Sequence, residues 1–166
     1  MNSVPQKKIC LVGTSAVGKT SLVRRFVHGL FSDEYLTTIG VRIDKKEVKL
    51  PDGTAVQLIV WDLNGEDRFQ QLSMSYLRGS AGYLLVADGT RPASIDTALD
   101  LRRRIEAQHG PLPLVLLLNK VDLSTEWTVT DDRLDELNAE ATVLLTSAKT
   151  GHQVSRAFRL LTEQFL

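Results

Sequence analysis

The sequence has little cysteine, no net charge and no long apolar run. Its 166 residues include one cysteine, Cys10, so no disulfide can form within the chain, which fits a reducing compartment. Lys+Arg and Asp+Glu both number 20, and this balance argues against a nucleic-acid-binding protein with a basic surface. No apolar run is long enough to span a membrane, and the polar residues 1–8 lack a signal-peptide core. We therefore expect a cytoplasmic protein with no nucleic-acid partner.

The whole chain is 43% hydrophobic and 24% charged, a composition that is typical of one globular domain covering 1–166. Cys10 falls inside the first predicted strand, where a cysteine is usually a small buried core residue.

A glycine-rich stretch, Gly13–Thr20, has the pattern G-x-x-x-x-G-K-[ST] of a phosphate-binding loop. An apolar run at 8–12 precedes it and apolar residues at helical spacing follow it, so the loop connects a strand to a helix. Backbone N–H groups of such a loop, with the helix N-terminus, bind anions. We expect Lys19 to neutralise the β- and γ-phosphates and the Thr20 hydroxyl to ligate Mg²⁺. The other expected nucleotide contacts here are Ser15, Ala16, Val17, Gly18 and Ser21.

After the first helix, which Gly29 is expected to end, strands alternate with helices. A hairpin is predicted over 41–61, with its turn at 51–54 and a break of register at Lys45 and Lys46. A connector with a short helix covers 62–78. The later segments are strands at 82–88, 113–118 and 142–146 and helices at 92–109, 130–140 and 154–165. This order predicts an α/β fold with a six-stranded, mostly parallel sheet, one antiparallel edge strand and helices on both faces.

Ligands of such sheets bind beyond the carboxyl ends of the strands, where three more motifs lie. The first is D-x-x-G, in which Asp62 could hold Mg²⁺ through a water and the Gly65 N–H could reach a γ-phosphate. The second is N-K-x-D at 119–122, which is much more selective.

In that second motif the Asp122 carboxylate can accept two hydrogen bonds from guanine, at N1–H and the 2-amino group. Adenine offers no such pair of donors, so the acid would be left buried and unpaired. Asn119 begins this motif, and the stem of Lys120 can lie over the base. The third motif, 146–149, can offer backbone N–H groups to the guanine oxygen from its residues Ser147, Ala148 and Lys149.

The four motifs, in this order and at these strand ends, resemble those of the Ras-like small GTPases over residues 7–165. The Rab-type branch is the most similar, since 35–41 looks like its first switch and 61–69 like its second. The resemblance implies a P-loop NTPase fold of the G-domain type, with GTP or GDP and Mg²⁺ as cofactors.

The resemblance also implies roles for residues in the switches. Thr38 would bind Mg²⁺ and the γ-phosphate in the GTP state, Phe31 would pack against guanine, and Tyr35 would cover the phosphates. Lys19, Thr38 and Gly65 would support catalysis together with Glu66, the residue that follows Gly65. Effectors, exchange factors and GTPase-activating proteins would read residues 32–42 and 62–78 of a monomer. Ile39, Trp61, Phe69 and Leu72 are candidate contacts for such partners or, equally, core residues.

The chain departs from the family at Glu66, where a glutamine normally orients the attacking water. An ionised glutamate only accepts hydrogen bonds and repels the γ-phosphate, so we expect slow GTP hydrolysis. Neighbouring Asn64 is a weaker candidate for orienting the water. An alternative is a scaffold that binds GTP and barely hydrolyses it. A P-loop ATPase or kinase would require the N-K-x-D motif to be a coincidence.

Family members on membranes usually end in a tail with prenylated cysteines, and residues up to Leu166 contain none. Either the sequence is shortened or the protein is not lipidated, as in bacterial relatives, and we expect no direct membrane anchor in this chain.

Overall fold

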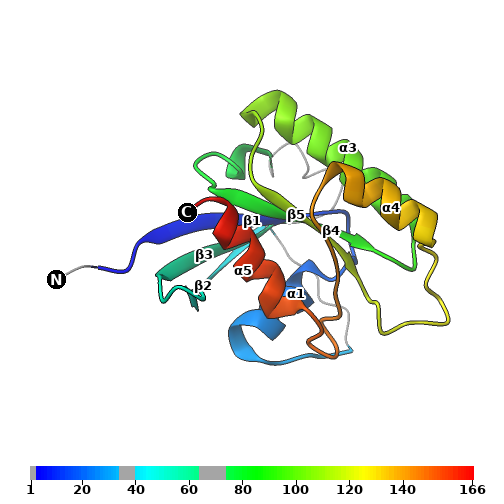
Figure 1. Ribbon diagram of the computed structural model, residues 1–166, viewed down its shortest axis with the longest axis horizontal. Coiled ribbons are helices and arrows are strands. Elements are labelled where there is room, and N and C mark those ends of the chain that lie inside the picture. Colours follow the sequence, from blue (N-terminus) through cyan, green and yellow to red (C-terminus); the bar gives the residue numbers. More distant parts are fainter. Residues whose placement is uncertain (1–2, 34–39, 64–73) are drawn as a thin grey trace.

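The computed structural model describes residues 3–33, 40–63 and 74–166, which contain one six-stranded sheet (Figure 1). The strand order is β2-β3-β1-β4-β5-β6, and among neighbouring strands only β2 and β3 run antiparallel in this part of the chain. The predicted α/β sheet with an antiparallel edge strand is therefore confirmed. The strands are β1 (Gln6–Val12), β2 (Val41–Lys49), β3 (Ala55–Leu63), β4 (Gly82–Asp88), β5 (Leu114–Asn119) and β6 (Val143–Leu145).

Helices cover both faces of the sheet, as Figure 1 shows. Their bounds are α1 (Lys19–His28), α3 (Pro92–His109), α4 (Asp131–Glu140) and α5 (Val154–Gln164). Alternate residues of β1 divide between the faces: Ile9 packs in a core cluster with α1 and α5, whereas Cys10 packs in a second cluster with α3. Cys10 is fully buried, which confirms it as a core residue, and burial raises the pKa of its thiol to about 11. None of these helices is long and apolar enough to cross a membrane.

The predicted break of register in β2 is wrong. Its pairing with β3 runs without interruption from Val41 opposite Leu63 to Lys49 opposite Ala55. The apolar alternation changes along β2 because its two ends are covered on opposite faces: Val41 packs against the α3 cluster, whereas Val48 is buried in the α1 and α5 cluster. When the buried face of a strand changes from one end to the other, the apolar alternation in its sequence shifts by one residue. The same shift would be expected from a break in register, although the pairing here is continuous.

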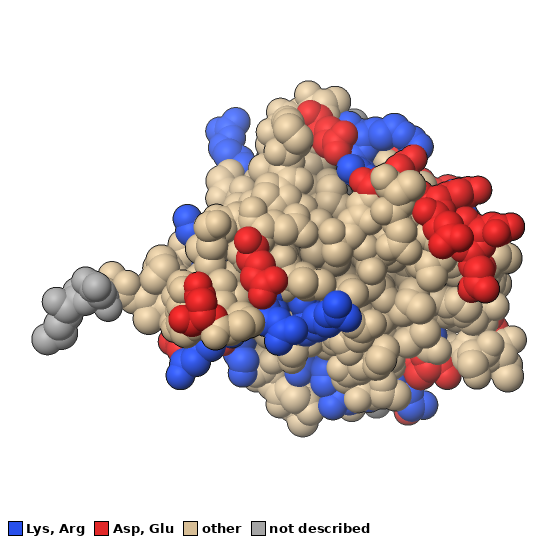
Figure 2. Space-filling model, in the orientation of Figure 1, with Lys and Arg blue, Asp and Glu red and all other residues tan. Residues whose placement is uncertain are grey.

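Capping residues determine where helices α1 and α4 begin or end. Helix α1 begins directly after Gly18 and ends at Gly29, whose φ of 67° and N–H bonds to the last carbonyls confirm the predicted stop. Helix α4 is polar, but the Thr130 side chain caps its first turn at the Arg133 N–H. Acidic residues in that turn suit the positive helix end, and Figure 2 shows acidic side chains gathered over α4.

One candidate partner contact lies in the described chain, at Trp61 in β3. Its indole stands 5.7 Å from the Tyr76 ring, and the Lys8 ammonium lies 3.8 Å from the indole centroid. Trp61 is half-buried, and its role toward a partner stays a prediction. The candidates Ile39, Phe69 and Leu72 lie outside the described residues, as does most of the connector predicted over 62–78.

Candidate functional site

The glycine-rich loop runs from the carboxyl end of β1 to the start of α1, as its pattern predicts. Its first glycine is held closely against the sheet: a Cβ on Gly13 would stand 2.3 Å from the carbonyl oxygen of Val86 in β4. A Cβ on Gly18 would stand 2.3 Å from the amide nitrogen of Asn119, and Gly18 has a φ of 101°. Close neighbours therefore require glycine at both positions, and at Gly18 the left-handed backbone requires it as well.

Lys19 lies inside the loop and is only 7% exposed. Its ammonium donates to the carbonyl oxygen of Gly13 at 2.8 Å and to that of Thr14 at 2.9 Å. Burial lowers the pKa of Lys19 to about 8, although the nearby Asp62 carboxylate opposes this shift. The loop thus encloses a cation whose charged form gains from an approaching anion.

Thr20 and Asp62, both predicted at the metal, contact each other. The Thr20 hydroxyl donates to Asp62 Oδ2 at 2.5 Å, and the Asp62 residue is fully buried at the end of β3. The described ranges hold no group of three His, Cys, Asp or Glu side chains that could hold a metal. Mg²⁺ is usually bound by one or two carboxylates with waters and substrate phosphates, so a hydroxyl beside one carboxylate fits this ion.

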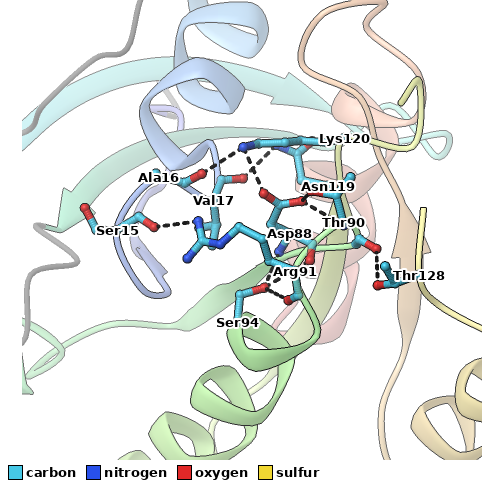
Figure 3. Close-up of polar contacts among 11 residues, drawn as sticks. Ser15, Ala16, Val17, Asp88, Thr90, Arg91, Ser94, Asn119, Lys120 and Thr128 are labelled. Atoms are coloured by element: carbon cyan, nitrogen blue, oxygen red, sulfur yellow. Dashed lines mark hydrogen bonds and ion pairs between the residues drawn. The ribbon is translucent and has the colours of Figure 1, made fainter. Parts of the chain in front are cut away.

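Asn119 joins the phosphate loop to the sheet. Its side-chain amide donates to the Val17 carbonyl oxygen at 3.0 Å (Figure 3). It also accepts from the Thr146 hydroxyl at 3.1 Å. The Asn119 residue is 2% exposed, so these bonds form in a dry environment. The first residue of the N-K-x-D motif therefore holds three segments together, and its contact with the nucleotide stays a prediction.

Lys120 makes a second bridge to the same loop. Its ammonium donates to the Ala16 carbonyl oxygen and lies beside Asp88 Oδ2, at 2.9 Å in each case (Figure 3). Burial alone would raise the pKa of Asp88, but hydrogen bonds from Thr90 and Lys120 outweigh it and lower that pKa. Asp88 is a site residue that the sequence reasoning missed, although it ends a buried strand as Asp62 does.

The two predicted base-reading motifs meet at Asp122. The Ser147 hydroxyl donates to Asp122 Oδ1 at 2.7 Å, so one carboxylate oxygen is fixed from the loop after β6. Ser147 is fully buried and Ala148 is 3% exposed, whereas Asp122 is half-buried. Residues from the ends of β1, β3, β4, β5 and β6 thus converge at one edge of the sheet.

Comparison with known proteins now decides the family. The family model described as Ras family matches residues 8–166. The chain belongs to the Ras family.

Individual relatives of this Ras-family chain are Rab proteins. Ras-related protein Rab-32 of Homo sapiens is 34% identical over 96% of this chain and 74% of its own length. Ras-related protein Rab-7L1 of Rattus norvegicus is 33% identical over 96% of this chain and 81% of its own. The match to Ras-related protein Rab-32B of Dictyostelium discoideum, 33% identical, spans 64% of that relative. The chain is therefore a Ras-like small GTPase of the Rab-type branch.

Several predicted residues of this Ras-family site are not tested. Tyr35, Thr38, Gly65 and Glu66 lie outside the described residues. Phe31 is partly buried against the core cluster of α1 and α5, so its contact with a base stays a prediction.

Two arginines contact the loops of the Ras-family site without any sequence signal for it. Arg91, just before α3, donates to the Ser15 carbonyl oxygen at 3.2 Å (Figure 3). Arg25 in α1 donates to the Ala148 carbonyl oxygen at 2.8 Å. Helical spacing predicts which face of α1 is apolar, but not which distant loop meets a polar side chain.

We expect Gly13→Ala to impair both stability and nucleotide binding. The added methyl group would meet the backbone oxygen of Val86, which cannot move without disturbing β4. Overpacking of this kind costs about 1–3 kcal/mol in free energy of unfolding. Thermal unfolding with and without GDP measures both effects. Gly53→Ala is the control, because it adds backbone strain at a φ of 88° with no atom within 4 Å; equal losses in the two variants would contradict the packing argument.

Proposed function

We propose that this chain is a guanine-nucleotide-dependent molecular switch, which binds GTP or GDP with Mg²⁺ and hydrolyses GTP slowly. The observation that carries the proposal is the Asn119 side chain, which connects the phosphate loop at Val17 with the base-reading loop at Thr146. A phosphate site and a guanine site that share one rigid connection suit a single ligand with both groups.

The described residues suggest a division of roles. Lys19 and the loop N–H groups bind phosphate oxygens, and Asp122 accepts from the guanine edge while Ser147 fixes its carboxylate. The Thr20 hydroxyl would ligate Mg²⁺ and Asp62 would hold it through a water, and the bound ion would supply positive charge to the polyphosphate. Their mutual hydrogen bond keeps both oxygens at one point of the site.

The slow reaction rests on Glu66, with Thr38 and Gly65 contacting the γ-phosphate side. Phosphoryl transfer in these enzymes depends on positioning and on stabilising charge that develops on the phosphate oxygens. An ionised glutamate cannot donate to those oxygens, and its negative charge opposes theirs. Hydrolysis would then wait for a partner that supplies the missing donor.

We expect Glu66→Gln to raise the single-turnover rate of GTP hydrolysis at least several-fold. The amide can donate to the phosphate while accepting from the attacking water, which the carboxylate cannot do. The measurement is GTP cleavage in the presence of Mg²⁺ after identification of the bound nucleotide. Brisk turnover of the unsubstituted protein would contradict this account, because another residue would then position the water.

A second candidate function is a scaffold that binds GTP with negligible hydrolysis, and the same glutamate favours it. In that case neither the unsubstituted protein nor Glu66→Gln would cleave GTP in a single turnover. Competition of GTP against ATP measures the preference for guanine over adenine. Equal binding of the two nucleotides would favour an ATPase or kinase.

Partners would read the two segments 32–42 and 62–78 together. The start of β2 and the end of β3 pair directly, with Val41 opposite Leu63, so the described ends of both segments are neighbours. Order in these segments that depends on the γ-phosphate would let effectors, exchange factors and GTPase-activating proteins distinguish the bound nucleotide.

We expect GDP affinity to fall as the pH rises above about 8. Burial lowers the pKa of Lys19 to about 8, and contact with phosphate would keep the ammonium charged, so binding above that pH must take up a proton. The dissociation constant should then rise by up to about tenfold per pH unit. Calorimetry in buffers of different ionisation enthalpy measures the uptake. An affinity that is constant from pH 7 to 9 would contradict this role for Lys19.

A further inference from the structure

We propose that Arg25 is a positioning residue for guanine recognition, which holds the backbone that meets the oxygen at C6 of the base. This inference rests on the proposed guanine-nucleotide site. Arg25 Nε donates to the Ala148 carbonyl oxygen at 2.8 Å, and its Nη2 donates to the carbonyl oxygen of Lys149. Its Nη1 lies 3.4 Å from the carbonyl oxygen of Gly29. One side chain of α1 thus contacts both the last base-reading loop and the segment that leads to Phe31.

The element that carries Arg25 is fixed in place. The neighbouring Phe26 stacks on Phe158 of α5, with ring centroids 3.8 Å apart and planes at 4°. Arg25 itself is half-buried, and its planar guanidinium presents donors in a rigid fork. A charged fork on a packed helix can therefore hold two consecutive carbonyl groups in one orientation.

Those carbonyl groups decide where the adjacent N–H groups point. In a planar trans peptide, the C=O of one residue and the N–H of the next point in opposite directions. The Ser147 carbonyl accepts from the Gly151 N–H at 2.9 Å, and this aims the Ala148 N–H. The Ala148 carbonyl accepts from Arg25, and this aims the Lys149 N–H. These are two of the N–H groups that could donate to the guanine oxygen.

Arg25 acts on this part of the loop and leaves the other contact with guanine alone. In the described chain, Arg25 is the hydrogen-bond donor to both carbonyls, of Ala148 and Lys149. Asp122 is held by the Ser147 hydroxyl, a contact in which Arg25 takes no part. Loss of Arg25 should therefore weaken recognition of the oxygen at C6, while recognition of the 2-amino group remains.

Comparing the affinities for three nucleoside diphosphates distinguishes this role from general support of the fold. GDP and IDP both carry an oxygen at C6, IDP lacks the 2-amino group, and ADP carries an amino group at C6. We expect Arg25→Ala to weaken GDP and IDP by about tenfold or more, as loss of hydrogen bonds to a charged donor does. ADP should change less than about twofold, so that the preference for guanine over adenine falls about tenfold.

The experiment measures dissociation constants of the three diphosphates with Mg²⁺ by competition against a fluorescent GDP. Arg25→Lys should lose less than Arg25→Ala, because an ammonium keeps the charge but not the planar fork. Melting temperatures are measured first; if Arg25→Ala does not fold, Arg25→Lys and Arg25→Gln carry the same comparison of bases.

Two control variants come from the same region. Arg24→Ala changes the neighbouring arginine of α1, whose side chain makes no hydrogen bond or ion pair with residues in the described ranges. Asp33→Ala removes an exposed partner of Lys149, 4.0 Å from its ammonium, and exposed pairs of this kind contribute little. Both variants should keep all three affinities within about twofold of the unsubstituted protein.

Two results with the Arg25 variants would overturn the inference. Equal weakening of GDP, IDP and ADP in the Arg25 variants would mean that Arg25 supports the fold and not the base. Unchanged affinities in folded variants would mean that its bonds do not matter. A protein that binds GDP no better than ADP before any substitution would overturn the proposed function, and the role of Arg25 with it.

Discussion

Asp122→Asn is expected to reduce the affinity for GDP by about 10⁴-fold, because a site built to bond a base loses that much when the pairing is removed. The carboxylate offers two acceptors, which match the N1–H and 2-amino donors of guanine. The new amide offers one acceptor and a donor that faces the 2-amino group. XDP carries an oxygen at that position, so its affinity should rise relative to that of GDP.

The contact with Ser147 makes this test specific. The Ser147 hydroxyl donates to Asp122 Oδ1 at 2.7 Å, and an amide oxygen can accept the same bond, so the side chain should keep its position. Competition of GDP, XDP and ADP measures the preference. Asp88→Asn is a matched control, because Asp88 is 1% exposed and contacts Lys120. It should weaken GDP and XDP alike, and an unchanged base preference in Asp122→Asn would contradict guanine recognition by Asp122.

Lys19→Met is expected to weaken nucleotide binding strongly while leaving the protein folded. Loss of one member of a buried charge pair costs about 2–5 kcal/mol, which corresponds to a roughly 30- to 4,000-fold weaker dissociation constant for GDP. Methionine fills a similar volume without a charge. The affinities for GDP and GTP are measured at pH 7, where Lys19 is largely protonated because its pKa is about 8.

The stability of this variant should change little, because two effects oppose each other. A pKa lowered from 10.5 to about 8 means that burying the charge costs on the order of 3 kcal/mol, and methionine removes that cost. The same change leaves the carbonyl oxygens of Gly13 and Thr14 without their donor, at about 1–3 kcal/mol. Denaturant unfolding of the nucleotide-free protein tests this balance. A variant that unfolds would show that the lysine holds the loop together.

The elements that the sequence predicted best are those whose local signals agree. The helix over Pro92–His109 and the strand over Gly82–Asp88 have the predicted bounds. In the helix, a proline at the first turn and a glycine after the last one mark both ends. In the strand, an unbroken apolar run is buried on both faces.

The phosphate loop and the N-K-x-D motif were also predictable, because their residues are close in sequence and follow strand ends. The contacts of Asp88 and Arg25 were not, since each depends on which distant segment the fold brings alongside. The register of β2 was misjudged for a related reason: the covering of each end of that strand comes from helices elsewhere in the chain. Sequence patterns report local geometry, and tertiary contacts decide the rest.

The bonds of Asn119 also bear on how the protein is made. Asn119 bonds to Val17 of the phosphate loop, 102 residues earlier in the chain. It also bonds to Thr146, which follows β6 and lies 27 residues later. A ribosome therefore has to synthesise nearly the whole chain before the two halves of the site can meet. Until then the growing chain has no complete pocket for the nucleotide, and the stabilisation that a ligand gives to a native protein is not yet available to it. Cellular GTP would act on the finished protein, as the last contribution to its folding.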